Sequence, residues 1–236
     1  MRDSDLRHFV SEFLGFDETN AGDSPPSLPG AMLYASHRVR FFLELSNQGR
    51  KLIYAVLGGL VAGTALAFVA VDGAPLTLLL LQDNGAVLRG EVWRLVTSII
   101  VAPPNLFGLG DVVFNVIALA WLDGLFAQTY SRRQYYAVFL ATGIAGNVFS
   151  LANGPKVISF GASGGIFGLL AGVVSFDLAT NRRLDPSLVL WFIGVFLVSS
   201  FLFASVDWIA HAGGALIGLG LGYVVGVSRG EDPTAV

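Results

Sequence analysis

Six long runs of mainly apolar residues follow a polar N-terminal segment. The first reads "KLIYAVLGGLVAGTALAFVAV" and is long enough to cross a bilayer core of about 30 Å as a helix. The six runs cover residues 51–71, 111–128, 134–151, 162–179, 187–205 and 208–226. This pattern predicts an all-α membrane protein that folds as a bundle of six transmembrane helices.

The segments outside the runs predict two tails and one long loop. Residues 1–50 are polar and acidic and include "NAGDSPPSLPG", so we expect a largely mobile tail with one short helix near 4–14. The membrane domain then covers 51–227, and 228–236 form a short C-terminal tail. Between the first two runs, residues 72–110 contain only short or interrupted apolar stretches, which are typical of interfacial segments.

Lysine and arginine predict the orientation, because loops on the cytoplasmic side carry more of them. With six spans and both ends inside, eleven of the 14 fall on the inner side. The outer three are Arg89, Arg94 and Lys156. The opposite orientation reverses this bias, so we expect cytoplasmic termini and an outward-facing loop at 72–110. The compact chain suggests a multi-pass protein of a prokaryotic cell membrane.

The composition agrees with a membrane protein and excludes several kinds of chemistry. Hydrophobic residues make up 54% of the chain and charged residues 13%, against roughly 25% charged residues in soluble domains. The chain has no cysteine, so it has neither disulfides nor thiolate chemistry. With a net charge of −3 and no basic cluster, we expect no nucleic-acid partner. No metal-binding or phosphate-binding motif is present, so we expect no cofactor and no metal.

Two polar residues in the membrane region could form a catalytic pair. Ser163 lies in the first turn of the fourth run, within "SFGASGGIFGLLAG", and His211 lies in the first turn of the sixth. Both turns begin on the outer side, so both side chains lie at a similar shallow depth. A serine nucleophile needs a base within hydrogen-bond reach, and the free N–H groups at a helix start can stabilise an oxyanion. A packing or hydrogen-bonding role for the lone histidine is the alternative.

Glycine stripes accompany both residues. The stripes are Gly164, Gly168 and Gly172 in the fourth run, and Gly214, Gly218 and Gly222 in the sixth. Small residues at every fourth position let two helix backbones approach closely. If the stripes face each other, Ser163 and His211 can touch, although the spacing could also arise by chance in a chain with 29 glycines.

Taken together, these motifs resemble those of rhomboid intramembrane serine proteases. Four features match in the family's order: Trp93–Arg94 in the long loop, Asn115 in the second run, "GASG" at 161–164 and "HAGGALIG" at 211–218. The likeness covers roughly residues 50–226. It implies a six-helix rhomboid-like bundle with a Ser–His dyad that opens to the outer face.

The resemblance also implies roles for individual residues. Ser163 would be the nucleophile and His211 the base, while Asn115 and Gly161 would support the oxyanion. Phe167, one turn after Ser163, matches a position where the family often places an aromatic ring against the histidine. Each of the supporting residues has a plainer interpretation, since an amide can bridge helices and a phenylalanine can pack in the core or face lipid. For Trp93–Arg94 we favour an interfacial anchor, with an aromatic ring and a snorkelling cation at headgroup level.

The sequence departs from the family pattern at two places. Four residues before Asn115, where rhomboids commonly have a histidine that assists the oxyanion, this chain has Asp111. An ionised carboxylate only accepts hydrogen bonds and would repel an oxyanion, whereas a protonated carboxyl could donate to it. The family's acidic residue at the end of the second helix has no obvious match near Ala127 and Gln128.

The sequence therefore favours a serine endopeptidase that cleaves transmembrane segments of other membrane proteins near the outer face. Its partners would be the lipid bilayer and substrates with helix-breaking or small residues near the cut; the sequence leaves the oligomeric state open. One alternative is a rhomboid-like pseudoprotease that binds membrane clients without cleavage, which Asp111 would favour. A small transporter or channel is the other, although few charged residues line the spans.

Overall fold

A computed structural model describes residues 45–71, 73–181, 184, 186–201 and 206–230. Most of the predicted tail 1–50 lies outside these residues, as do the short helix expected near 4–14 and residues 231–236 of the C-terminal tail.

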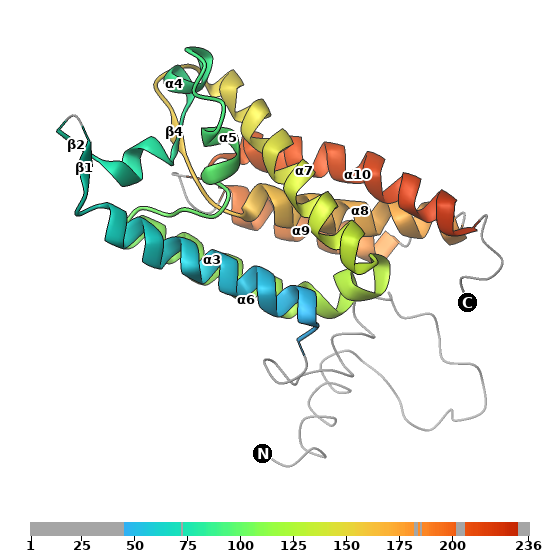
Figure 1. The fold of residues 1–236 in the computed structure, drawn as a ribbon. Helices are drawn as coiled ribbons and strands as arrows, with labels where there is room; N and C mark the ends of the chain where they lie inside the picture. Colours follow the sequence, from blue (N-terminus) through green and yellow to red (C-terminus); the bar gives the residue numbers. More distant parts are fainter. Residues whose placement is uncertain (1–44, 72, 182–183, 185, 202–205, 231–236) are drawn as a thin grey trace, which may run out of the picture.

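Six long helices in the described part of the chain overlap the six apolar runs (Figure 1), but the helix of the first run ends at Leu66, and Ala70–Val71 of that run form a short strand. They are α3 (Asn47–Leu66), α6 (Leu106–Thr129), α7 (Arg132–Ser150), α8 (Ser163–Asn181), α9 (Pro186–Phe201) and α10 (Trp208–Gly230). Four of them, α6, α7, α8 and α10, are long and apolar enough to cross a membrane, and α9 is a shorter apolar helix. A mainly helical fold with apolar spans is thus confirmed, while six membrane crossings stay a prediction.

Local side-chain caps explain where several of these helices begin. The Asn105 side chain accepts a hydrogen bond from the N–H of Gly108 at the start of α6. Ser131 and Gln134 form a capping box at the start of α7, one residue after α6 is terminated at Tyr130. Such caps satisfy N–H groups that have no partner within the helix. The polar residues between apolar runs therefore set the helix ends.

Helices α7, α8 and α10 pack against one another (Figure 1), and α8 meets α10 along its glycine stripe. A Cβ atom on Gly214, Gly218 or Gly222 of α10 would overlap the carbonyl oxygen of Gly164, Gly168 or Gly172 of α8, respectively. The backbones of the two helices are therefore in direct contact at three successive turns. The predicted meeting of the two stripes is confirmed, and it brings the starts of α8 and α10 together.

The connection between α3 and α6 folds into short elements at one end of the bundle, which we call the loop end (Figure 1). They are the hairpin β1 (Ala70–Val71) and β2 (Ala74–Pro75), η1 (Leu76–Leu79), β3 (Gln82–Asp83), α4 (Asn84–Leu88) and α5 (Arg94–Thr97). Strand β3 pairs antiparallel with β4 (Ile158–Ser159), which follows η2 (Leu151–Asn153) and precedes α8. This pairing ties the long connection to the segment that leads into Ser163.

Arg94 organises the loop end, and our prediction that it snorkels at the membrane surface was wrong. The residue is only 4% exposed, and its guanidinium donates to the carbonyl oxygens of Leu78 and Leu81 at 2.5 and 2.8 Å. It also pairs with Glu91 at 2.7 Å. A planar guanidinium with five N–H donors can join three acceptors at once, which explains its burial. Trp93 stays half-exposed, as an interfacial ring would.

A second buried charged residue lies at the opposite end of the bundle. Asp123 of α6 is 2% exposed and accepts hydrogen bonds from the N–H and hydroxyl of Ser46 at 2.6 and 2.8 Å. The hydroxyl of Tyr135 on α7 donates to the same carboxyl at 3.3 Å. Asp123 thus joins the start of α3 to α6 and α7. It provides an acidic residue near the end of the second run, four positions before Ala127.

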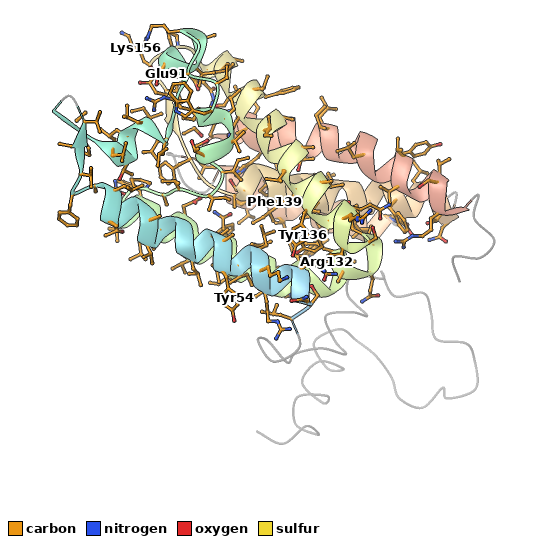
Figure 2. The ribbon with its side chains drawn as sticks, viewed as in Figure 1. Tyr54, Glu91, Arg132, Tyr136, Phe139 and Lys156 are labelled. Carbon is orange, nitrogen blue, oxygen red and sulfur yellow. The ribbon has the colours of Figure 1, made fainter. Side chains whose placement is uncertain are left out.

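Charged side chains lie at both ends of the bundle, and the lysines and arginines are distributed between these ends as the predicted orientation requires. Glu91 and Lys156 lie at the loop end in Figure 2, and Arg132 lies at the opposite end with Tyr136. Arg50 and Lys51 at the start of α3 are also at that opposite end, since the preceding Gly49 lies against Asp123. This separation fits the predicted topology, although which end faces the cytoplasm stays a prediction.

Candidate active site

The structure places Ser163 and His211 in hydrogen-bond contact at the loop end. Ser163 is the first residue of α8, and His211 lies in the first turn of α10. The serine Oγ and the histidine Nε2 are 2.8 Å apart. A neutral imidazole that carries its proton on Nδ1 can accept the serine proton at Nε2. The geometry is therefore that of a nucleophile beside a general base.

Aromatic rings enclose the imidazole of His211, which is 4% exposed. The Phe167 ring lies with its centroid 4.6 Å from that of the imidazole and is tilted by 37°. Phe196 of α9 approaches edge-on at 6.4 Å. Phe167 therefore occupies the position that the family resemblance implied. The two rings restrict the rotation of the imidazole and keep Nε2 directed at Ser163.

Asp207 fixes the turn that carries His211. Its carboxylate accepts hydrogen bonds from the N–H of Ala210 at 3.0 Å, from the Asn153 side chain at 2.8 Å and from the Ser150 hydroxyl. The start of α10 is thereby capped and attached to the end of α7. We did not predict this role, although an aspartate one turn before a histidine that opens an apolar run is a recognisable N-cap pattern.

The backbone turn before Ser163 depends on Gly161. Its φ angle is +117°, a conformation that favours glycine, and its N–H donates to the carbonyl oxygen of Ser98 at 2.9 Å. A Cβ atom here would lie 2.7 Å from both oxygens of the Asp111 carboxyl. Glycine therefore lets this carboxyl reach the turn and sets the direction in which α8 begins.

Asp111 and Asn115 form a second polar cluster next to this turn. Asn115 is 1% exposed, and its Nδ2 donates to Oδ2 of Asp111 at 2.8 Å. The Oδ1 atom of Asn115 is buried and has no hydrogen-bond partner among the described residues. Through Gly161 the cluster adjoins the Ser–His pair. The six predicted site residues thus lie in the N-terminal halves of α6, α8 and α10 or, for Gly161, in the turn that precedes α8.

This arrangement provides the groups needed for acyl transfer. It combines a hydroxyl, a base and a helix start whose first N–H groups have no partner one turn back. In the described part of the chain, no group of three or more His, Asp or Glu side chains could hold a metal ion. Among the described residues, the polar side chain recorded in contact with Ser163 is that of His211, which can serve as its general base.

Comparisons with known proteins point to one family. A model of the Rhomboid domain matches residues 89–228. "Rhomboid protease GluP" of Bacillus subtilis is 26% identical over 151 residues, which cover 63% of this chain and 29% of the relative. "RHOMBOID-like protein 1" of Arabidopsis thaliana is 31% identical over 149 residues, covering 61% and 37%. "RHOMBOID-like protein 6, mitochondrial" of the same plant is 29% identical over 164 residues, covering 67% and 52%.

The chain thus spans between 29% and 52% of the length of these three relatives. The relatives come from a bacterium and a plant, so prokaryotic origin stays a prediction. The family match covers more than half of the chain and includes both clusters of the site, from Asp111 to His211. Together with the four apolar helices, it indicates an integral membrane protein. The chain belongs to the rhomboid family.

Proposed function

We propose that this protein is an intramembrane serine endopeptidase. Its substrates are the transmembrane segments of other membrane proteins, which it cleaves near the outer face. The observation that carries the proposal is the 2.8 Å contact between Ser163 Oγ and His211 Nε2 in a chain of the rhomboid family. A serine and a histidine that served only to pack helices would not need this alignment at a helix start.

In the proposed mechanism, Ser163 Oγ attacks the scissile carbonyl carbon while its proton moves to His211 Nε2. The carbonyl oxygen becomes an oxyanion, which the backbone N–H of Ser163 and the amide of Asn115 stabilise. His211 then returns the proton to the leaving amine, and an acyl-enzyme remains. Water, deprotonated by His211, then attacks the acyl carbon; the bond to Ser163 Oγ breaks, and His211 returns the proton to Oγ.

The proposed topology places this chemistry near the outer surface. Six crossings with cytoplasmic termini would put the loop end outside, because α3 begins inside and the starts of α6, α8 and α10 are then external. The clustering of Arg50, Lys51 and Arg132 at the other end supports this orientation through the positive-inside rule. A dyad at shallow depth can receive the water that hydrolysis needs.

Substrate choice follows from the chemistry of a helical substrate. Carbonyl groups of a transmembrane helix are hydrogen-bonded within the helix, so a scissile bond must unwind before Ser163 can reach it. Glycine costs roughly 1 kcal/mol more than leucine in a helix interior, so small and helix-breaking residues lower the cost of unwinding. Cleavage should therefore concentrate at such residues near the outer end of the segment.

A matched pair of single-span substrates tests this proposal in liposomes that contain the purified protein. One substrate has a Gly-Gly pair near the outer end of its apolar segment, and the other has Leu-Leu there. Two such changes favour unwinding by about 2 kcal/mol, so we expect cleavage of the first to be faster by on the order of 10-fold or more. Mass spectrometry of the products should place the cut within the apolar segment.

Two other outcomes of the substrate comparison would contradict parts of the proposal. Equal cleavage of the two substrates would contradict the need for local unwinding. Cleavage of neither substrate, with both bound, would identify a client-binding pseudoprotease.

A further inference from the structure

The side-chain amide of Asn115 engages a partner through only one of its two ends. In the present arrangement the amide nitrogen is directed to Asp111 Oδ2, and Oδ1 is buried without a hydrogen-bond partner among the described residues. A buried, unpartnered amide oxygen costs roughly 1–3 kcal/mol, so native structures seldom contain one without a reason. Here the carboxyl of Asp111 engages only the nitrogen end of the amide, and the oxygen end is left without a partner among the described residues.

The orientation matters because an oxyanion requires a donor. The free end of the amide in this arrangement is Oδ1, which only accepts hydrogen bonds and would repel a negative oxygen. The two ends of a carboxamide have nearly the same shape, and a half-turn about the Cβ–Cγ bond exchanges them. After this half-turn, Oδ1 faces Asp111 and the NH₂ group occupies the free end.

We propose that Asp111 is a positioning residue that holds Asn115 in this second orientation. As a neutral carboxylic acid, Asp111 donates its O–H to Oδ1 of Asn115, and the NH₂ group of Asn115 is left to donate to the oxyanion. This inference rests on the proposed function. Asp111 keeps its proton throughout the reaction and does not itself touch the substrate. If Asp111 is ionised, it draws the NH₂ group to itself and removes the donor.

The surroundings of Asp111 favour this role. Among the described residues, its carboxyl is recorded against the uncharged Asn115 amide and the Gly161 backbone. Gly161 is itself held by Ser98, so the carboxyl is confined between Asn115 and the turn that precedes Ser163. The carboxyl can therefore engage the amide only from one side.

The charged groups on neighbouring elements are directed elsewhere. His211, on α10, faces Ser163, and Asp207 is bound by Asn153 and Ser150. Arg50 and Lys51 follow Gly49 of α3, which lies against Asp123, about three turns along α6 from Asp111. At the loop end, Arg94 is bound by Glu91 and by loop carbonyls.

The pH dependence of kcat/KM for one transmembrane substrate tests the inference. His211 must be neutral to act as a base, so activity falls at low pH. Asp111 must be protonated, so wild-type activity also falls as the pH rises through its titration. Asp111→Asn donates to Oδ1 of Asn115 at every pH, so we expect its activity to persist on the alkaline side. Asn115→Ala should lower kcat by roughly 100-fold, as loss of one oxyanion donor does.

A double-mutant comparison separates an indirect role from a direct one. In the Asn115→Ala background, Asp111→Asn should leave the alkaline limb unchanged, because no amide remains to be positioned. If Asp111→Asn still extends this limb, Asp111 acts directly on the oxyanion and the inference is overturned. Superimposable profiles for wild type and Asp111→Asn would also overturn it. Thermal unfolding of each variant checks that folding is retained.

Labelling by a fluorophosphonate probe distinguishes failure of the inference about Asp111 from failure of the proposed protease function. If wild type reacts at Ser163 and cleaves substrate but the profiles do not differ, the inference fails and the proposed function stands. If wild type neither reacts nor cleaves, both are contradicted.

Discussion

Alanine at Ser163 or at His211 is expected to lower kcat/KM for a model transmembrane substrate by at least about 10³-fold. The two side chains act as a unit through one hydrogen bond, so the double variant should lose about as much as either single variant. The measurement is the cleavage rate in liposomes for wild type, the two single variants and the double variant. Wild-type cleavage by Ser163→Ala would contradict the proposed mechanism.

Ser175→Ala provides the matched control for this loss. Ser175 is a buried serine on the same helix, and its hydroxyl donates to the carbonyl oxygen of Gly172 at 3.1 Å. Loss of such a local bond should change stability by only about 1 kcal/mol and leave cleavage near the wild-type rate. If Ser175→Ala and Ser163→Ala lose cleavage equally, the effect is not specific to the nucleophile.

Valine at Gly218 is expected to separate α10 from α8 and thereby to slow cleavage, because the new side chain clashes with the backbone of α8. A Cβ atom here overlaps the carbonyl oxygen of Gly168, and the backbone of α8 cannot yield as a side chain would. Overpacking in a well-packed core costs roughly 1–3 kcal/mol, and a clash with backbone belongs at the upper end or beyond. We therefore expect a lower Tm in detergent and slower cleavage, because His211 moves away from Ser163.

Gly220→Val tests whether this effect comes from the contact between the helices. Gly220 lies two residues further along α10, is exposed, and has nothing within 4 Å of a Cβ atom. The same substitution there should leave both Tm and cleavage close to wild type. Equal behaviour of Gly218→Val and Gly220→Val would remove the packing argument.

The sequence predicts the helices well because their signal is local. Apolar runs, glycine spacing and capping residues such as Asn105 and Ser131 all lie within one segment, and the observed helices follow them. The pairing of β3 with β4 joins two-residue strands that are distant in the sequence: Gln82 and Ser159 are 77 positions apart, and Asp83 and Ile158 are 75 positions apart. Pairings this short and distant leave no local pattern in the sequence, so the arrangement of the short elements within residues 72–110 could not be predicted.

The residues of the site likewise fall into those that a local sequence pattern identifies and those that depend on distant contacts. Ser163 and His211 could be identified because each opens an apolar run, and the glycine stripes indicate that the two runs meet. Arg94 was misjudged because the sequence reveals its charge but not the loop carbonyls that surround it. The approach of the Asp111 carboxyl to the turn at Gly161 likewise joins residues that are 50 positions apart, and no local pattern predicts it.

Reaction with a fluorophosphonate probe tests the central claim, that Ser163 is an activated nucleophile, without any assumption about the substrate. The purified full chain in liposomes is incubated with the probe, and the labelled residue is identified by mass spectrometry. We predict labelling of wild type at Ser163, none in Ser163→Ala, and wild-type labelling in Ser175→Ala. An unlabelled wild type whose fold is intact by thermal unfolding, or labelling that persists in Ser163→Ala, would contradict the account.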